Sequence, residues 1–103
     1  MALSTNAQLG TSETTIYTPA SESAVLSIIF YNSTATTKTV TCYAYPTGGS
    51  ASATTTLFKI DIAAYNTFTW SGDEKFVLAT SDKISAIADT ATSVSVVAVY
   101  KVL

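Results

Sequence analysis

Residues 93–102 alternate two sets of side chains, and this alternation constrains the fold more than any other feature of the chain. One set is apolar and comprises Val94, Val96, Ala98, Tyr100 and Val102; the other comprises Ser93, Ser95, Val97, Val99 and Lys101. Successive side chains of a β-strand point to opposite faces of a sheet, so a period of two predicts a strand with one face in a core. Residues 1–103 contain no convincing helical stripe, and we therefore expect an all-β protein.

Other short apolar runs, separated by turn-forming residues, predict further strands at 14–18, 24–31, 38–45, 55–62, 67–70, 76–78 and 83–88. In the most apolar run, Leu26, Ile28 and Phe30 are expected on one face, whereas Val25, Ile29 and Tyr31 share the other. We expect residues 71–74 (SGDE) to form a turn. This spacing predicts a seven- to eight-stranded antiparallel β-sandwich, jelly-roll-like in its arrangement.

The chain has 103 residues, a length that fits one domain. Residues 1–12 carry only Leu3 and Leu9 as large side chains for a core, and we interpret them as an extended N-terminal arm beside a single sandwich domain at 13–103. So little apolar surface does not offset the cost of ordering a backbone, roughly 1 to 2 kcal/mol per residue. We therefore expect the arm to order on a partner, with Leu3 and Leu9 inserting into that partner's surface.

Composition excludes several classes of function. The chain has no His and no Arg, so it offers neither the imidazole of common catalytic triads and zinc sites nor a guanidinium fork for phosphate. Five Lys against seven acidic residues, a net charge of -2, make a poor surface for nucleic acid. No window of about 20 residues is apolar enough for a membrane span, and residues 1–10 do not resemble a signal peptide. We expect no enzymatic activity, no cofactor, no metal, no nucleic acid and no membrane, and synthesis in a cytoplasm.

Few residues could carry chemistry. Asp73 and Glu74 are adjacent carboxylates that a hydrolase or, with Asp82, a calcium site could use, but a solvated turn explains them more simply. Cys42 is the only cysteine, so the chain forms no internal disulfide, and its mid-strand position favours a place in the core.

The aromatic residues are more informative. The chain has six Tyr, four Phe and one Trp, and Tyr43, Tyr45 and Tyr65 fall on faces or turns that need not be internal. Exposed tyrosines serve both protein interfaces and sugar sites, and we favour a protein interface. Trp70 alternates with Phe68 and is expected in the core, with stacking on a sugar as the alternative.

Several motifs occur in a familiar order: residues 14–19 (TTIYTP), 24–32 (AVLSIIFYN), 40–43 (VTCY), 62–68 (IAAYNTF) and 77–86 (VLATSDKISA). Over about residues 14–102 the chain resembles small β-sandwich accessory proteins of tailed-bacteriophage virions. One departure is Ser81, because relatives often have Gly before the residue equivalent to Asp82.

The resemblance implies a capsid decoration or cement protein, with no catalytic residues. Its partners would be the major capsid protein or other virion proteins, and it would form a homo-oligomer, often a trimer, located in the virion. The arm residues Leu3 and Leu9, together with Tyr43, Tyr45 and Tyr65, are the candidate partner-binding residues. The alternative is a carbohydrate- or receptor-binding module at a tail or fibre tip.

Overall fold

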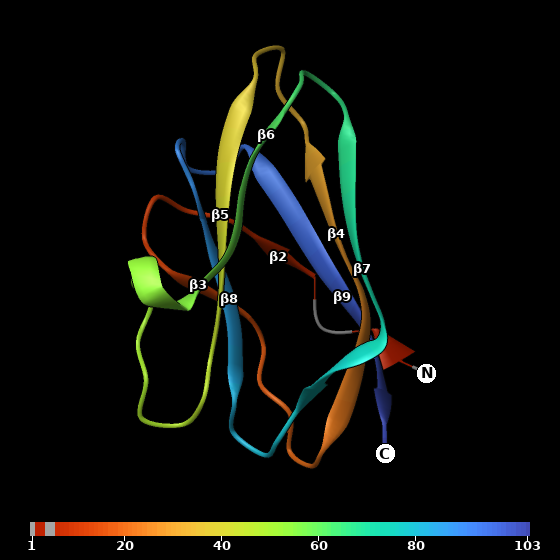
Figure 1. Cartoon of the computed structure of the whole chain (residues 1–103). Coiled ribbons are helices and arrows are strands. Elements are labelled where there is room, and N and C mark those ends of the chain that lie inside the picture. The colour runs from red at the N-terminus through yellow and green to blue at the C-terminus, as the bar shows by residue number, and fades with distance from the viewer. Residues whose placement is uncertain (1, 4–5) are drawn as a thin grey trace.

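The structure is a computed structural model that describes residues 2–3 and 6–103, without the side chains of Ala2 and residues 72–75. Two antiparallel sheets pack face to face (Figure 1). Sheet A contains β1 (Ala2–Leu3), β2 (Ala7–Gln8), β4 (Ser23–Asn32), β7 (Thr67–Leu78) and β9 (Val94–Val102). Sheet B contains β3 (Thr14–Tyr17), β5 (Lys38–Tyr45), β6 (Thr56–Ile62) and β8 (Lys83–Ala88). A single 3-10 turn, η1 (Ala53–Thr55), precedes β6.

The strand order is β1-β9-β4-β7 in sheet A, with β2 also on β9, and β3-β8-β5-β6 in sheet B. When β1 and β2 are counted as one interrupted strand, this is the order of an eight-stranded jelly roll. The prediction of an antiparallel β-sandwich is confirmed. Each sheet buries one face and leaves the other outside, because alternate side chains along every strand point in opposite directions.

The core lies between the sheets. Sheet A contributes fully buried apolar side chains of β4 and β9, and sheet B contributes those of β5 and β8; the largest are Phe30, Ile28, Ile84, Val40 and Val94. On β9 the alternation is right for Val94, Val96 and Ala98, which are buried, but Tyr100 is only half-buried and Val102, at the end of the strand, is 56% exposed. Cys42 also lies in the core, which confirms its predicted place.

β4 contains a β-bulge that the sequence pattern did not predict. Its pairing with both β7 and β9 shifts register between Val25 and Ser27. A bulge inserts one extra residue and so reverses which face the preceding residues occupy. Val25 therefore joins Ile28 and Phe30 in the core, whereas Leu26, expected there, is only half-buried.

The expected turn at 71–74 is also wrong. The two predicted segments 67–70 and 76–78 belong to one strand, β7, whose backbone continues through residues 71–75. Ser71 pairs with Ser27 of β4, and the next paired residue of β7 is Phe76, which pairs with Val25. The unpaired residues of β7 therefore lie opposite the bulge in β4. The adjacent carboxylates Asp73 and Glu74 lie outside the described side chains, and their predicted roles stay untested.

The largest correction concerns the N-terminal segment. β1 and β2 pair with the edge of β9, and Leu9 is 0% exposed, within the core. The backbone N–H of Leu9 donates to the carbonyl of Val94 at 2.8 Å, and Thr92 donates to the carbonyl of Leu9 at 3.1 Å. Residues 7–9 thus belong to the sandwich instead of forming an arm outside it. The cost of ordering them is offset by the ladder and by burial of Leu9.

Buried Asn32 joins the two sheets at one end of the molecule. Its side-chain amide donates to the carbonyls of Thr36 and Ile62 at 2.8 and 2.9 Å, and its side-chain oxygen accepts from Thr34. One side chain therefore connects the turn after β4 with the end of β6. A buried amide with several partners fixes loops strongly, because each lost bond leaves a desolvated polar group.

Candidate interaction surfaces

The five residues expected to bind partners lie in different environments. Leu3 and Tyr65 are 64% and 61% exposed, and Tyr43 is half-buried on the outer side of β5. Leu9 is in the core, and Tyr45 is only 8% exposed, so neither is available to a partner. The structure does not bring these residues together into one site.

Tyr45 is covered because the loop after β5 folds back on it. The N–H of Gly49 donates to the carbonyl of Pro46 at 2.9 Å, and a Cβ built on Gly49 would lie 3.2 Å from the Cβ of Tyr45. Glycine therefore permits this close approach. The Tyr45 hydroxyl donates to Glu13, and the Lys83 ammonium lies 5.9 Å from the centroid of the Tyr45 ring.

Among the described side chains, the outer side of sheet A carries no charge over three rows that cross its strands. The side chains of Asp73, Glu74 and Lys75, which follow Ser71 on β7, lie outside that description. Register places Ile29 opposite both Thr69 and Val97, with Ser27 and Tyr31 in the flanking rows. Directly opposed residues share a face, so the rows read across β1 or β2, β9, β4 and β7. They are Leu3, Val99, Ser27 and Ser71 in the first row, Val97, Ile29 and Thr69 in the second, and Gln8, Ser95, Tyr31 and Thr67 in the third. We call these eleven residues the uncharged face.

The uncharged face has two exposed large hydrophobic side chains and one hollow. Leu3, at one corner, is 64% exposed, and Tyr31 is 39% exposed in the opposite outer row. The hollow has a volume of about 110 Å³ and is lined by Asn6, just before β2, and by Ile29, Tyr31, Ser95, Val96 and Val97. The desolvation free energy of hydroxyl and aliphatic groups is much smaller than that of ions, so a partner protein can bury this surface at a low desolvation penalty.

The outer side of sheet B is different, and we call it the charged face. Its charged residues are Glu13, Lys59, Asp61, Lys83 and Asp89. The Thr39 hydroxyl donates to the Asp61 carboxylate at 2.7 Å. Glu13 accepts from the hydroxyls of Ser85 and Tyr45, and these hydrogen bonds hold the pKa of Glu13 below its usual 4.5. Burial, followed by the hydrogen bond to Glu13, raises the pKa of Tyr45.

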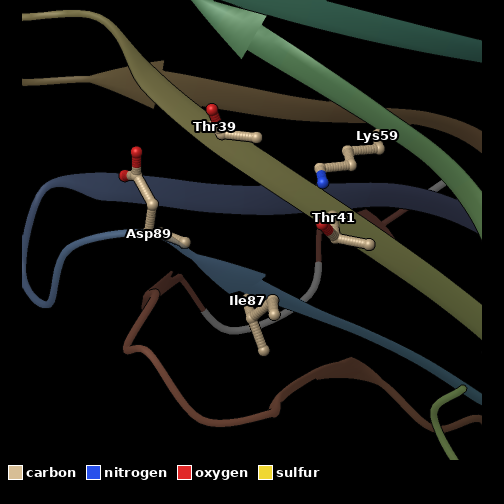
Figure 2. A pocket seen from close by; sticks show the side chains of 6 residues that line it. Thr39, Thr41, Lys59, Ile87 and Asp89 are labelled. Carbon is tan, nitrogen blue, oxygen red and sulfur yellow. The ribbon is translucent and has the colours of Figure 1, made fainter.

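The charged face contains a shallow hollow of about 330 Å³ (Figure 2). Figure 2 shows Lys59, on β6, and Asp89, just after β8, at opposite ends of it. Thr39, Thr41 and Ile87 line the space between, with buried Ala88. Hydroxyl, ammonium and carboxylate groups around one hollow could hydrogen-bond a polar ligand.

Trp70 and Cys42 are engaged in packing. Trp70 is half-buried, stacked on Phe58 with ring centroids 6.3 Å apart and in edge contact with Phe76 at 5.3 Å. Both contacts place Trp70 among the aromatic rings that pack against the core. Burial raises the pKa of the Cys42 thiol to about 12, so it stays protonated near neutral pH and unreactive.

Within the part of the chain whose side chains are described, no three His, Cys, Asp or Glu residues come together in a group that could hold a metal ion. The Asp82 carboxylate, considered as a calcium ligand, accepts from the backbone N–H of Ala79 at 2.8 Å, as in a turn. The described residues also form no helix long and apolar enough to span a membrane.

Comparison with known proteins gives a similar fold and no family. No protein-family model and no curated protein matches this sequence. A solved structure of a Bacillus endospore appendage protein, from a family that forms disulfide-linked pili, has a similar fold with a TM-score of 0.53. The identity is 16%, over 99% of this chain and 84% of that one. At this identity the likeness establishes the β-sandwich fold alone.

Proposed function

We propose that this chain is a non-enzymatic structural protein of a bacteriophage virion, a decoration or cement protein that binds capsid subunits and stabilises the head. The observation that carries the proposal is the uncharged face, which brings eleven residues from β1, β2, β4, β7 and β9 together, none of them with a side chain that is charged at neutral pH. Depletion of charge, with exposed aromatic and aliphatic side chains, is typical of the buried centre of protein interfaces.

The aromatic residues support assembly more than sugar binding. A sugar site would gather accessible aromatic rings around a hollow, whereas the hollow of the charged face has no aromatic lining and that of the uncharged face has one aromatic side chain, Tyr31. A third hollow, of about 210 Å³, is lined by Tyr45 and Phe76, but Tyr45 is only 8% exposed. Tyr65, on the turn between β6 and β7, is exposed at one end of the sandwich. Scattered exposed tyrosines on a rigid scaffold suit contacts with several neighbouring proteins.

The structural neighbour offers a fold-level analogy. That protein belongs to a family of disulfide-linked pili, so a sandwich of this kind can serve as the subunit of an assembly. The present chain cannot copy the covalent link through its only cysteine, because Cys42 is fully buried. Its assembly would therefore depend on non-covalent contacts, which makes the uncharged face more important.

The proposal is tested by measuring the chain in purified virions by mass spectrometry. We expect the wild-type chain in fixed stoichiometry with the capsid protein. Val97→Glu and Thr69→Lys place a charge in the middle row, and each should reduce incorporation at least ~10-fold, since an unpaired charge in an interface costs several kcal/mol. Lys59→Glu on the charged face is the matched control and should incorporate normally. Thermal melting confirms that every variant is folded. Absence of the chain from virions, or full incorporation of both middle-row variants, would overturn the proposal.

A second function, carbohydrate or receptor binding at a tail or fibre tip, is favoured by one observation, the hollow between Lys59 and Asp89. Its test is a glycan array with the wild-type chain, Lys59→Ala and Asp89→Ala. Lys38→Ala is the control, since Lys38 lies outside the hollow and donates to Thr90. Binding that both hollow variants abolish, and the control retains, would place this function first.

A further inference from the structure

We propose that two copies of this chain bind each other through the uncharged face, related by a two-fold axis that runs across the strands along the middle row of Val97, Ile29 and Thr69. The inference rests on the proposed function, because it names a second copy as one partner of the assembly surface. In this arrangement the first row of one copy covers the third row of the other. Such a contact is isologous, which means that both copies use the same surface, and it therefore forms a dimer to which no third copy can add through this face.

Electrostatics favours a second copy on this face. In an isologous contact every charge near the axis meets its own copy, so a face that pairs with itself must avoid charge at its centre. The eleven residues of the uncharged face satisfy this condition, whereas on the charged face a two-fold axis that passes through Lys59 or Asp89 would bring that charge close to its own copy. Lys101, the next outward residue on β9 beyond Val99, would lie at opposite ends of the two copies.

Shape favours the same axis. Leu3 is 64% exposed in the first row on the β1 side, and the hollow beside Asn6 and Ser95 lies between the second and third rows on the same side. Exchange of the first and third rows by the two-fold axis therefore sets Leu3 of each copy over Gln8, at the rim of the other copy's hollow. A hollow of about 110 Å³ has several times the ~30 Å³ that liquid water occupies per molecule, enough for an aliphatic side chain to enter.

The size of the face predicts how tightly two copies would bind. Strands lie about 4.8 Å apart and alternate residues about 7 Å apart, so four strands and three rows cover roughly 400 Å² in plan. Stable complexes bury about 800 Å² on each partner. The pair should therefore be weak, with a dissociation constant in the micromolar range or above, and would matter where many copies are concentrated on a particle.

The first experiment is sedimentation equilibrium of the purified chain over a concentration series up to the millimolar range. We expect a reversible transition from one copy to two. Leu3→Ala should weaken the pair roughly 10-fold, the effect of no longer burying one leucine, and Val97→Glu should abolish it. Thr41→Glu, a matched insertion of charge on the charged face, should leave the pair unchanged.

A second experiment tests the axis itself. A residue on a two-fold axis lies beside its own copy, so Val97→Cys and Thr69→Cys should each cross-link to dimers with a short bismaleimide. Thr41→Cys is the control and should not cross-link, and Cys42 stays unreactive because it is buried.

The outcomes separate this inference from the proposed function. A chain that remains monomeric at all concentrations, or that forms the trimer implied by the resemblance, overturns the two-fold pair. If such a chain still enters virions and the middle-row variants do not, the proposed function stands and the face binds capsid protein instead. If the pair forms but the chain is absent from virions, the proposed function fails and the pair remains.

Discussion

The two outer faces of this sandwich are made by the same alternation of side chains and yet differ in chemistry. On sheet A the outward positions of β4 and β9 hold Ile29, Val97 and hydroxyl residues, with no charge in three rows. On sheet B the outward positions hold lysines and carboxylates, some joined by hydrogen bonds such as that from Thr39 to Asp61. Packing of the core restricts the residue types only at inward positions. The residue types at outward positions therefore reflect whether a face contacts water or another protein. Charge on sheet B suits water, and its absence on sheet A suits another protein.

The largest loss of stability should come from the N-terminal segment, where Leu9 follows β2 and lies in the core. Leu9→Ala is expected to reduce the free energy of unfolding by about 2 to 5 kcal/mol, because it leaves a cavity in the core. Leu3→Ala, on the same segment but exposed, should change it by no more than about 0.5 kcal/mol. Urea unfolding of both variants checks this. Equal, small effects would mean that the segment is an arm outside the sandwich, as first expected from the sequence.

A smaller effect should appear on the charged face and depend on pH. Tyr45→Phe removes one donor to Glu13 and should cost about 1 kcal/mol at pH 7. The pKa of Glu13 is lowered in the folded chain, so its contribution to stability is complete above the unfolded value near 4.5 and is lost as the pH falls through the folded value. Urea midpoints of wild type and Glu13→Gln should therefore differ at pH 7 and converge in acid. A difference that persists unchanged below the folded pKa would contradict this assignment.

Ser81 lies on neither the uncharged nor the charged face and therefore provides a control for the comparison of the two faces. Ser81 has φ of 70°, in the left-handed region that favours glycine, and its N–H donates to the carbonyl of Pro19 at 3.1 Å. Ser81→Gly should raise the free energy of unfolding by about 0.5 kcal/mol, the relief of strain minus the added freedom of the unfolded chain. Self-association should not change.

Salt should have the smallest effect on pairing. Because no ion pair crosses the uncharged face, the dissociation constant should change less than about 2-fold when ionic strength increases to several times the physiological value. Sedimentation at low and high salt provides the measurement. A steep loss of pairing at high salt would indicate that the charged face makes the contact.

The sequence predicted those parts of the fold that depend on local alternation. The inward set of β9 is right because a half-buried strand must alternate, whatever its neighbours are. Leu26 and the turn at 71–74 are wrong because a bulge in β4 and the longer course of β7 arise from pairing between distant strands. Leu9 was misplaced because residues 7–9 are too few to show a period, and their partner, β9, lies at the other end of the chain.

The surfaces were harder to predict than the core. Tyr45 is outward on its strand, but the loop at Gly49 and the carboxylate of Glu13 cover it, and neither contact follows from spacing. The uncharged face could be found only in part. Residues 24–31 and 93–97 already show outward positions without charge, but the strand order was needed to place Ile29 beside Val97.

Hydroxyl-radical footprinting tests the central claim most directly, because it compares the two faces in one sample. Labelling is measured by mass spectrometry on the dilute free chain and on intact virions. Our account predicts that Tyr31 and Leu3 of the uncharged face lose labelling in virions, while Tyr43, on the outer side of sheet B, keeps it. Unchanged labelling of Tyr31 and Leu3, with protection of Tyr43, would show that the chain assembles through its charged face and would contradict the account.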